Sequence, residues 1–360
     1  MSANRLAFMP FIVACLIVSE TAAQDVTLGG QLRPRWESRD PYVVSATGGD
    51  WFVSMRTRAN ITAELERNVT VFVEFQDVRI WGEEANTLSD FSADNIDLHQ
   101  AYVELKKEGS TNLAAKAGRQ QVVFGGQRLV GAVNWTQQGR SFDAVKFSVG
   151  DERLHLDILG AVLANDLTAT FDSDAHFLAA YGQIKEAGPG TLDAYAMYNK
   201  VASATPTSQM TLGARWWGVS ENVDFRVEGS YQLGERMDTD VSAFMLGGRL
   251  GTRLNDGKAR LALWYDYLSG DDDPGDDQIK VFDTLFATNH KFYGLADYFL
   301  NIPVHTGGRG LQDIALKGSV MASNSVTLQC EIHSFRAAKS EGMSTGHFGE
   351  EFDLTAAYRY

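Results

Sequence analysis

The chain has 360 residues, with 46 acidic against 32 basic side chains and a formal net charge of -14. This acidic balance excludes nucleic acid as the expected partner, because nucleic-acid-binding domains present a positive surface. The mean hydropathy is -0.20, and no run of eighteen apolar residues follows the N-terminus. Two classes remain: a soluble secreted β protein, or a membrane β-barrel whose apolar residues alternate along each strand.

Residues 1–23 are predicted to be a signal peptide. Arg5 supplies the positive charge, residues 6–18 form an apolar run too short to span a membrane, and residues 21–23 are small. The mature chain would then start at Gln24. A lipoprotein reading around Cys15 is the alternative, but the apolar run continues past that cysteine. The mature chain keeps one cysteine, Cys330, so it has no internal disulfide or Cys/His metal spacing.

The N-terminal segments alternate between apolar and polar residues, as strands with two different faces do. Val26, Leu28 and Leu32 share one phase, and the arginines take the other. On the two adjacent segments the inward arginines are Arg33, Arg35, Arg56 and Arg58. Placing an arginine on the lipid face at mid-bilayer would cost about 2–4 kcal/mol, which sets the phase of each strand. We therefore expect a basic ladder on one wall of the lumen.

Residues 223–233 show the clearest alternation, and residues 350–360 end the chain on a strand with aromatic residues on one face. Phe352, Leu354, Tyr358 and Tyr360 lie on that apolar face. Helices need apolar residues three and four apart, so these segments are strands. An apolar outer face and an aromatic terminal strand are typical of transmembrane barrels.

The predicted connections alternate between short turns and long loops, the asymmetry of a barrel with periplasmic turns and extracellular loops. The short turns lie at residues 66–68, 107–112, 150–153, 186–190, 220–222, 255–257 and 322–325. The longer stretches include residues 120–139, 234–240, 268–311 and 338–349. The count is about sixteen antiparallel strands around an aqueous lumen. Eighteen strands are the alternative, if residues 282–299 hide a hairpin.

Further arginines take the inward phase, beside inward carboxylates. The predicted binding residues of the lumen wall are Arg33, Arg35, Arg56, Arg58, Arg119, Arg128, Arg140, Arg215, Arg226 and Arg249. Such a face can be a solvated wall of ion pairs. It can also bind carboxylate-bearing solutes through the planar forks of arginine and give the pore an anion preference.

Other chemistry receives little support. Asp271, Asp273 and Asp276 could gather a hard cation, but they lack the EF-hand spacing, and a solvated acidic loop is favoured. His176 lies beside Ser173 and Asp174 in a loop, where proximity in sequence does not make a catalytic triad. We expect no enzymatic activity and no cofactor.

The long loop at residues 268–311 is rich in aromatic residues, among them Phe282, Phe292, Tyr293 and Phe299. A long loop without strand pattern usually has a function, and exposed aromatics would make a sticky surface. We expect this loop to fold over or into the lumen and to pack there. Packing on extracellular neighbours is the alternative.

Three segments carry a family resemblance. They are GRQQVVFGGQRLVGAVNWTQQGRSFDAVKF at residues 118–147, DLHQAYVEL at residues 97–105, and the run from DYLSGDDD to HKFYGLADYF at residues 266–299. Together they resemble the alginate-export family of outer-membrane porins. The resemblance implies a monomeric barrel with an electropositive constriction, in a family whose best-known member exports an anionic uronate polysaccharide. Arg119, Arg128 and Arg140 lie in the first segment.

The sequence thus favours a passive channel for small anionic or sugar-acid solutes in the Gram-negative outer membrane. The expected partners are outer-membrane lipid, lipopolysaccharide, the barrel assembly machinery and the anionic solute. The alternative is an export pore for an anionic polysaccharide such as alginate, working with a periplasmic partner. A soluble β-sandwich is the third class.

Overall fold

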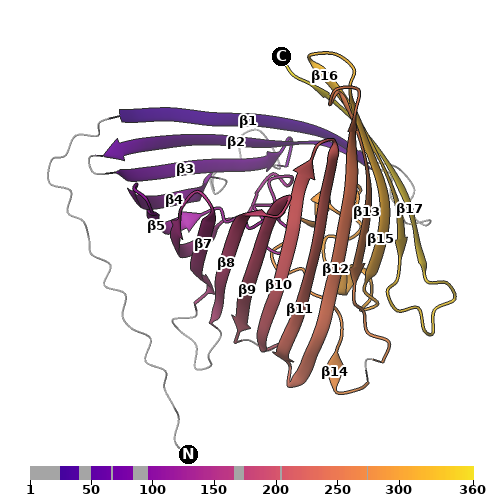
Figure 1. Ribbon diagram of the computed structural model, residues 1–360. Helices are drawn as coiled ribbons and strands as arrows, with labels where there is room; N and C mark the ends of the chain where they lie inside the picture. The colour runs from indigo at the N-terminus through magenta and orange to yellow at the C-terminus, as the bar shows by residue number, and fades with distance from the viewer. Residues whose placement is uncertain are drawn as a thin grey trace, which may run out of the picture.

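The computed structural model describes residues 25–39, 50–65, 68–83, 96–165, 174–202, 205–273 and 275–360. The predicted signal peptide lies outside these residues. The described chain is built almost wholly of antiparallel strands that curve around an interior, as Figure 1 shows. Sixteen strands have 9 to 16 residues, and β14 (Gln278–Ile279) has two.

The long strands follow one another along the sheet, each pairing with its neighbour in sequence. They are β1 (Asp25–Arg39), β2 (Asp50–Leu65), β3 (Val69–Ile80), β4 (Ile96–Lys107), β5 (Asn112–Gln120), β6 (Phe142–Gly150), β7 (Leu154–Ala164), β8 (Ala175–Ala187), β9 (Gly190–Val201), β10 (Thr207–Ser220), β11 (Val223–Arg236), β12 (Thr239–Leu254), β13 (Ala259–Leu268), β15 (Leu311–Met321), β16 (Val326–Arg336) and β17 (His347–Tyr358). β13 pairs directly with β15, and β14 adds two parallel pairs to the start of β12.

The sheet matches the predicted barrel, but its two edges do not meet. In the described part of the chain, no backbone pairing joins β17 to β1. The predicted count of about sixteen long strands is confirmed. The eighteen-strand alternative is wrong, because residues 282–299 contain turns and the short 3-10 helix η1 (Asn289–Lys291) instead of a hairpin. A single-turn helix, α1 (Ile302–His305), follows. No helix in the described ranges is long and apolar enough to cross a membrane.

The two faces of the strands behave as the alternation predicts. On β1, Leu28 and Leu32 are 75% and 67% exposed on the outer face, and Arg33 and Arg35 lie half-buried on the inner one. On β11, Val227 is 60% exposed beside the buried Arg226. Apolar side chains on the outside and polar ones inside are the opposite of a soluble protein, which is why this sheet suits a membrane.

Six of the predicted short turns are present, and the seventh, at residues 66–68, lies largely outside the described residues; one predicted long loop is absent from the described chain. Residues 234–240 were expected to form a loop, whereas β11 continues to Arg236 and β12 begins at Thr239. Met237 and Asp238 alone make the connection, and both have φ in the left-handed region, at 51° and 61°. Two such residues in succession form the tight turn that fits the twist of a hairpin. The sequence lacks the usual glycine signal there.

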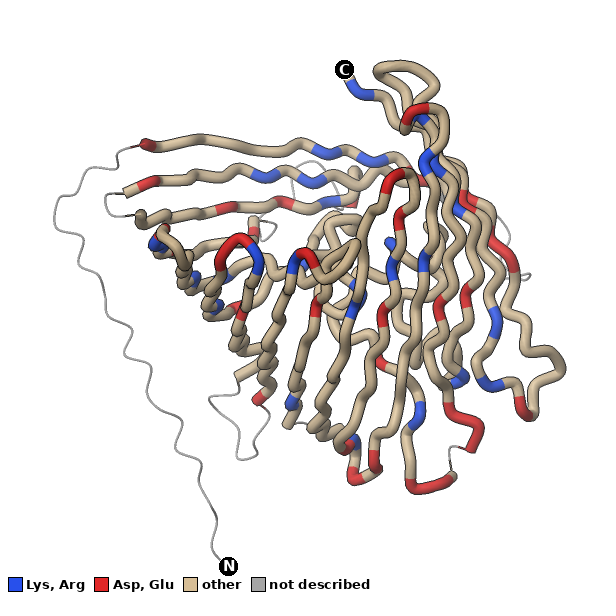
Figure 2. Tube along the Cα trace, in the orientation of Figure 1, with Lys and Arg blue, Asp and Glu red and all other residues tan. Residues whose placement is uncertain are grey.

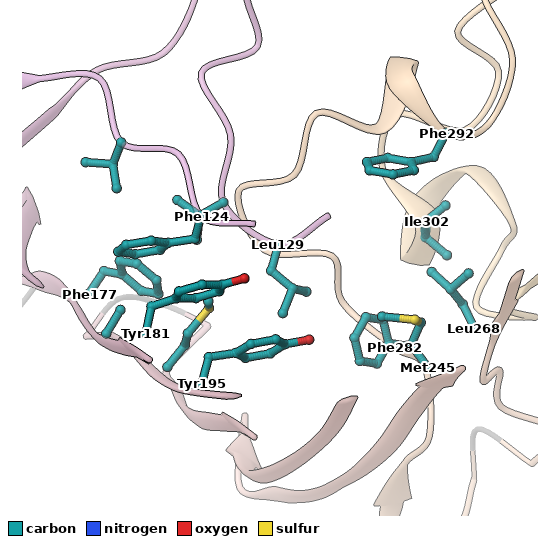
Figure 3. Close-up of a cluster of buried hydrophobic side chains, with 14 of the residues drawn as sticks. Phe124, Leu129, Phe177, Tyr181, Tyr195, Met245, Leu268, Phe282, Phe292 and Ile302 are labelled. Atoms are coloured by element: carbon teal, nitrogen blue, oxygen red, sulfur yellow. The ribbon is translucent and has the colours of Figure 1, made fainter. Parts of the chain in front are cut away.

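The lumen is only partly aqueous, contrary to the expectation. Two connections fold into it: residues 121–141, between β5 and β6, and residues 281–310, between β14 and β15. We call these two segments the plug. Figure 3 shows Phe124 and Leu129 of the first segment, and Phe282 and Ile302 of the second, among inward-facing strand residues. The expected inward packing of the long loop is confirmed, because Phe282, Phe292, Tyr293 and Phe299 are all at most 6% exposed.

Candidate functional site

The two plug segments pair with each other as short pieces of extended chain. The amide of Phe286 donates to the carbonyl of Leu129 at 2.8 Å, and the amide of Gly131 donates back to Phe286 at 2.9 Å. The amide of Thr288 donates to Gln127 at 3.0 Å. Backbone pairing satisfies polar groups that would otherwise be buried without partners. The two segments therefore form one body inside the barrel.

An aromatic contact adds to this pairing at the side of the plug near β1. The indole of Trp135 stacks on His290 with the ring centroids 3.9 Å apart. Its Nε1 donates to Asp297 at 3.0 Å, and Asp297 also contacts Nδ1 of His290 at 2.6 Å. The contact joins residues more than 150 positions apart in sequence. Sequence reasoning did not single out Trp135 or His290.

The predicted basic ladder exists, and most of its guanidinium groups face the plug. Arg33 lies directly opposite Arg56 in the register of β1 and β2. Arg35 and Arg58 each lie two residues further along their own strand. Figure 2 shows the basic segments of β1 and β2 side by side. Arg33 donates to the carbonyls of Asn134, Trp135 and Thr136 at 2.7 to 3.1 Å, and to the side chain of Gln137.

The other three arginines of the ladder continue this contact. Arg35 donates to the carbonyl of Trp135 at 2.8 Å. Arg56 reaches the carbonyls of Thr136 and Gln137 at 3.3 Å each, and Arg58 reaches that of Gln138 at 3.4 Å. Planar guanidinium forks suit several acceptors at once. The ladder therefore holds residues 134–138 against the barrel wall.

Backbone carbonyls accept hydrogen bonds from the ladder without cancelling its charge. Among the described residues, two carboxylates form ion pairs with it: Glu37, 2.7 Å from Arg35, and Glu74, 3.8 Å from Arg58. Among these six residues, four arginines against two carboxylates leave an excess of two positive charges. The ladder thus holds the plug and keeps an excess of positive charge.

The cations of a second basic group lie on β10 to β13 and in the plug, and we call this group, together with the carboxylates on β9 to β13 that they contact, the β10–β13 cluster. Its cations are Arg128, Arg215, Arg226, Arg249, Arg260 and Lys291, and its carboxylates are Asp193, Asp224, Glu228 and Asp266. Six cations against four carboxylates again leave two positive charges. Here, unlike at the ladder, most arginines contact a carboxylate directly.

Arg128 is the centre of this cluster and is 1% exposed. It contacts Asp266 at 2.9 Å and Glu228 at 3.3 Å, donates to the hydroxyl of Tyr293 at 2.9 Å and lies over the ring of Phe292. Burial opposes its charge, but the neighbouring carboxylates and Tyr293 outweigh burial and raise the pKa of Arg128 above its usual range. Arg128 therefore forms a buried structural ion pair with these carboxylates, and a solute could not reach it.

The remaining cations of the cluster have unused donors. Arg226 and Arg249 lie beside Trp264, at 4.6 Å and 5.5 Å from its ring. Among the residues that the structure describes, Nε and Nη2 of Arg226 and Nε of Arg249 are buried without a hydrogen-bond partner. Burial, then the nearby positive charges of Arg215, Arg226, Arg128 and Arg249, lower the pKa of the exposed Lys291. Free donors and excess positive charge are what an anion requires.

Two of the predicted binding arginines, Arg119 and Arg140, belong to neither the ladder nor the β10–β13 cluster. Arg140 donates to the carbonyls of Phe286 and Ala287 and braces the plug. Arg119 forms an exposed pair with Asp143 at 3.2 Å, beside a cavity of about 170 Å³ that His99 and Ser141 also line. The structure thus gathers eight of the ten predicted arginines into the ladder and the β10–β13 cluster.

The weak metal candidates Asp271, Asp273 and Asp276 lie in the loop around β14. Their oxygens accept backbone amides of the same loop, at 2.9 to 3.3 Å, and Asp276 contacts Lys280 at 2.5 Å. These carboxylates form turns with their own loop. Hydrogen bonds and the Lys280 charge lower the pKa of Asp276.

An open cavity with a volume of about 1080 Å³ lies between the ends of β1 to β3 and the plug. Arg35, Glu37 and Arg79 line it from the wall, and Trp135 and Asp297 line it from the plug. Because β1 and β3 end there in long connections, the cavity is at the extracellular mouth.

Solved structures with the same architecture are outer-membrane porins. OccK5 (OpdH) of Pseudomonas aeruginosa is 11% identical, with a TM-score of 0.60 over 93% of this chain and 87% of that one. OprD of the same organism is 13% identical, with a TM-score of 0.57 over 95% and 85%. An anion-selective porin from Comamonas acidovorans is 12% identical, with a TM-score of 0.51 over 93% and 96%. At these identities the likeness shows the fold.

No curated protein sequence matches the chain. Residues 24–357, however, match the model of the alginate export family. The match spans the barrel from its first strand to its last, and it includes both segments of the plug. The chain therefore belongs to the alginate export family and forms a channel in the Gram-negative outer membrane.

Proposed function

We propose that this channel passes small anionic solutes, in particular carboxylates and sugar acids, by passive diffusion and without catalysis. The observation that carries the proposal is the ladder, whose charge is met, in the described part of the chain, by backbone carbonyls and two carboxylates. A solute would pass from one region of excess positive charge to another, because the β10–β13 cluster also retains two positive charges. Charged rings of this kind set the ion preference of a narrow pore.

The plug favours small solutes over a polymer. It is held by the ladder, by backbone pairing between its two segments and by a buried aromatic core. Moving it aside for a polysaccharide would break these contacts together. Export of an anionic polysaccharide such as alginate, with a periplasmic partner, remains the second candidate because of the family. In either function, the chain would work as a monomer amid lipid and lipopolysaccharide after insertion by the barrel assembly machinery and removal of residues 1–23.

The test is electrical. The purified protein in a planar bilayer should show a reversal potential of anion-selective sign under a potassium chloride gradient. Replacing chloride by gluconate should preserve a measurable anion current, because a monovalent sugar acid fits the proposed route. A cation-selective channel would refute the anion preference. Stepwise current blocks by long oligouronates added on the periplasmic side, with no gluconate current, would favour the export pore.

A further inference from the structure

The inner face of β15 to β17 carries a group of side chains that the transport route does not use. In the register of β16 and β17, His333 lies opposite Glu351, and Glu331 lies opposite Asp353. Residues two apart on a strand share a face, so these four side chains point to the same side of the sheet. The sequence shows the pattern as E-I-H at residues 331–333 and E-F-D at residues 351–353.

The side chains converge closely enough to share one ion. Potential ligand atoms of Glu331, His333 and Asp353 all lie within 4.8 Å of one another. His333 is fully buried, and its Nδ1 is 3.0 Å from both carboxylate oxygens of Asp313. When Nδ1 donates its proton to Asp313, the lone pair of Nε2 points toward Glu331, 3.4 Å away. A histidine oriented by a carboxylate in this way is typical of metal sites.

Glu351 supplies a second observation at the same place. Its side chain is 7% exposed, and one oxygen accepts the amide of Ala296 at 2.8 Å. The other oxygen, Oε2, is buried and has no hydrogen-bond partner among the described residues. The carboxyl group also lies within hydrogen-bond reach of Asp353. Two carboxylates in contact, one with a buried free oxygen, are costly unless a cation or a proton lies between them.

The charge balance points the same way. Asp313, Glu331, Glu351 and Asp353 lie beside one lysine, Lys317, which contacts Glu331 at 2.5 Å. Counted as ionised, these four carboxylates outnumber the ammonium of Lys317 in a largely buried place. Lys317 and Nε2 of His333 both lie against Oε2 of Glu331, so the second oxygen of this carboxylate is the one it has to offer.

We propose that Glu331, His333 and Asp353 bind one divalent transition-metal ion beside Glu351, for which Zn²⁺ is the suitable probe. An imidazole nitrogen with carboxylate oxygens suits zinc and its first-row neighbours, whereas Mg²⁺ and Ca²⁺ prefer oxygen alone. Asp313 positions His333 for this role. The ion would lie beneath residues 294–296 of the plug, where the amides of Leu295 and Ala296 already donate to Asp353 and Glu351.

The test uses the full mature chain, refolded from denatured protein in detergent so that no lipopolysaccharide is present, and washed with a chelator. Titration calorimetry with Zn²⁺ and elemental analysis after dialysis should give one tightly bound ion per chain. His333→Gln and Asp353→Asn should each weaken binding at least about tenfold, and Asp313→Asn about 10–100-fold. Millimolar Mg²⁺ should not displace the ion.

A matched control exists on the opposite part of the wall. His155 of β7 also lies beside a carboxylate, with its Nε2 3.1 Å from Asp157, and a lysine, Lys146, completes that group. His155→Gln should leave the stoichiometry and affinity of zinc unchanged. Heat-modifiable gel mobility confirms that each variant is folded. If His333→Gln does not fold, Asp353→Asn tests the same site, because Asp353 is only half-buried. Absence of a stoichiometric ion in the wild type would overturn the proposal. So would equal affinity in the wild type and Asp353→Asn, or an equal loss in His155→Gln.

Discussion

The ladder and the β10–β13 cluster are built from the same residue type on the same face of the sheet, yet their arginines have different partners. The four arginines of the ladder donate mainly to carbonyl oxygens of residues 134–138. In the cluster, Arg128, Arg215 and Arg249 contact carboxylates at 2.6 to 2.9 Å. A carbonyl oxygen accepts hydrogen bonds from a guanidinium group without neutralising its charge. A carboxylate accepts the hydrogen bonds and also neutralises the charge.

This difference separates two uses of arginine in one lumen. The ladder combines holding the plug with keeping a positive wall at the mouth. The buried part of the cluster chiefly stabilises the interior, because breaking a buried ion pair leaves the other charge unpaired. Lys291, whose side chain is exposed, is the part of the cluster that a solute could reach. Three experiments can sharpen or break this division.

The largest effect is expected from Arg128→Met. The change leaves Asp266 and Glu228 buried without their counterion, so the free energy of unfolding should fall by about 3–5 kcal/mol. Urea unfolding in lipid vesicles, followed by heat-modifiable gel mobility, measures it. Arg119→Met is the matched control, because the Arg119–Asp143 pair has 37% and 62% exposed side chains. That pair should contribute no more than about 1 kcal/mol. Equal loss in the two variants would contradict a structural role specific to Arg128.

A second experiment separates the clamp from the charge of the ladder. Changing Arg33, Arg35, Arg56 and Arg58 together to lysine keeps four charges but removes the forks that hold residues 134–138. Single-channel conductance should rise several-fold while the reversal potential keeps its anion-selective sign. The corresponding serine variant should show the same rise and a shift toward cations, because the inward carboxylates then dominate. Unchanged conductance in both variants would mean that the ladder does not restrain the segment that limits the current.

The smallest effect is expected at Lys291. Because burial and the neighbouring arginines lower its pKa, its charge should be lost at a lower pH than that of an ordinary lysine. Raising the pH through that range removes one positive charge, so the anion preference in reversal-potential measurements should decline. Lys291→Gln should show a weaker preference at neutral pH and lack this step, with unfolding unchanged. A wild-type profile that is flat to pH 10 and matches Lys291→Gln would show that Lys291 does not face the route.

Much of the barrel could be predicted because its information is local. The alternation on β1 and β11 follows from the two-residue period of a strand, and an arginine cannot take the lipid phase without a large cost. The connection at Met237 and Asp238 was missed because Met237 has no turn preference and no glycine follows Asp238 to complete the usual two-residue signal. The inward packing of residues 268–311 was predictable from the aromatics in a long loop, since exposing them would be unfavourable.

By itself, the sequence determined the strands, their lipid-facing and inward phases, the short turns and the excess of inward arginine. Only the tertiary structure decided what each inward charge meets. Arg33 reaches Gln137, 104 positions away, and Arg128 reaches Asp266, 138 positions away. Likewise, Glu331, His333 and Asp353 converge through the register of two strands and the loop above them. The alternation of side chains along a strand is set by residues close together in sequence. The partner of a long charged side chain depends instead on how the curved sheet and the plug bring distant segments together.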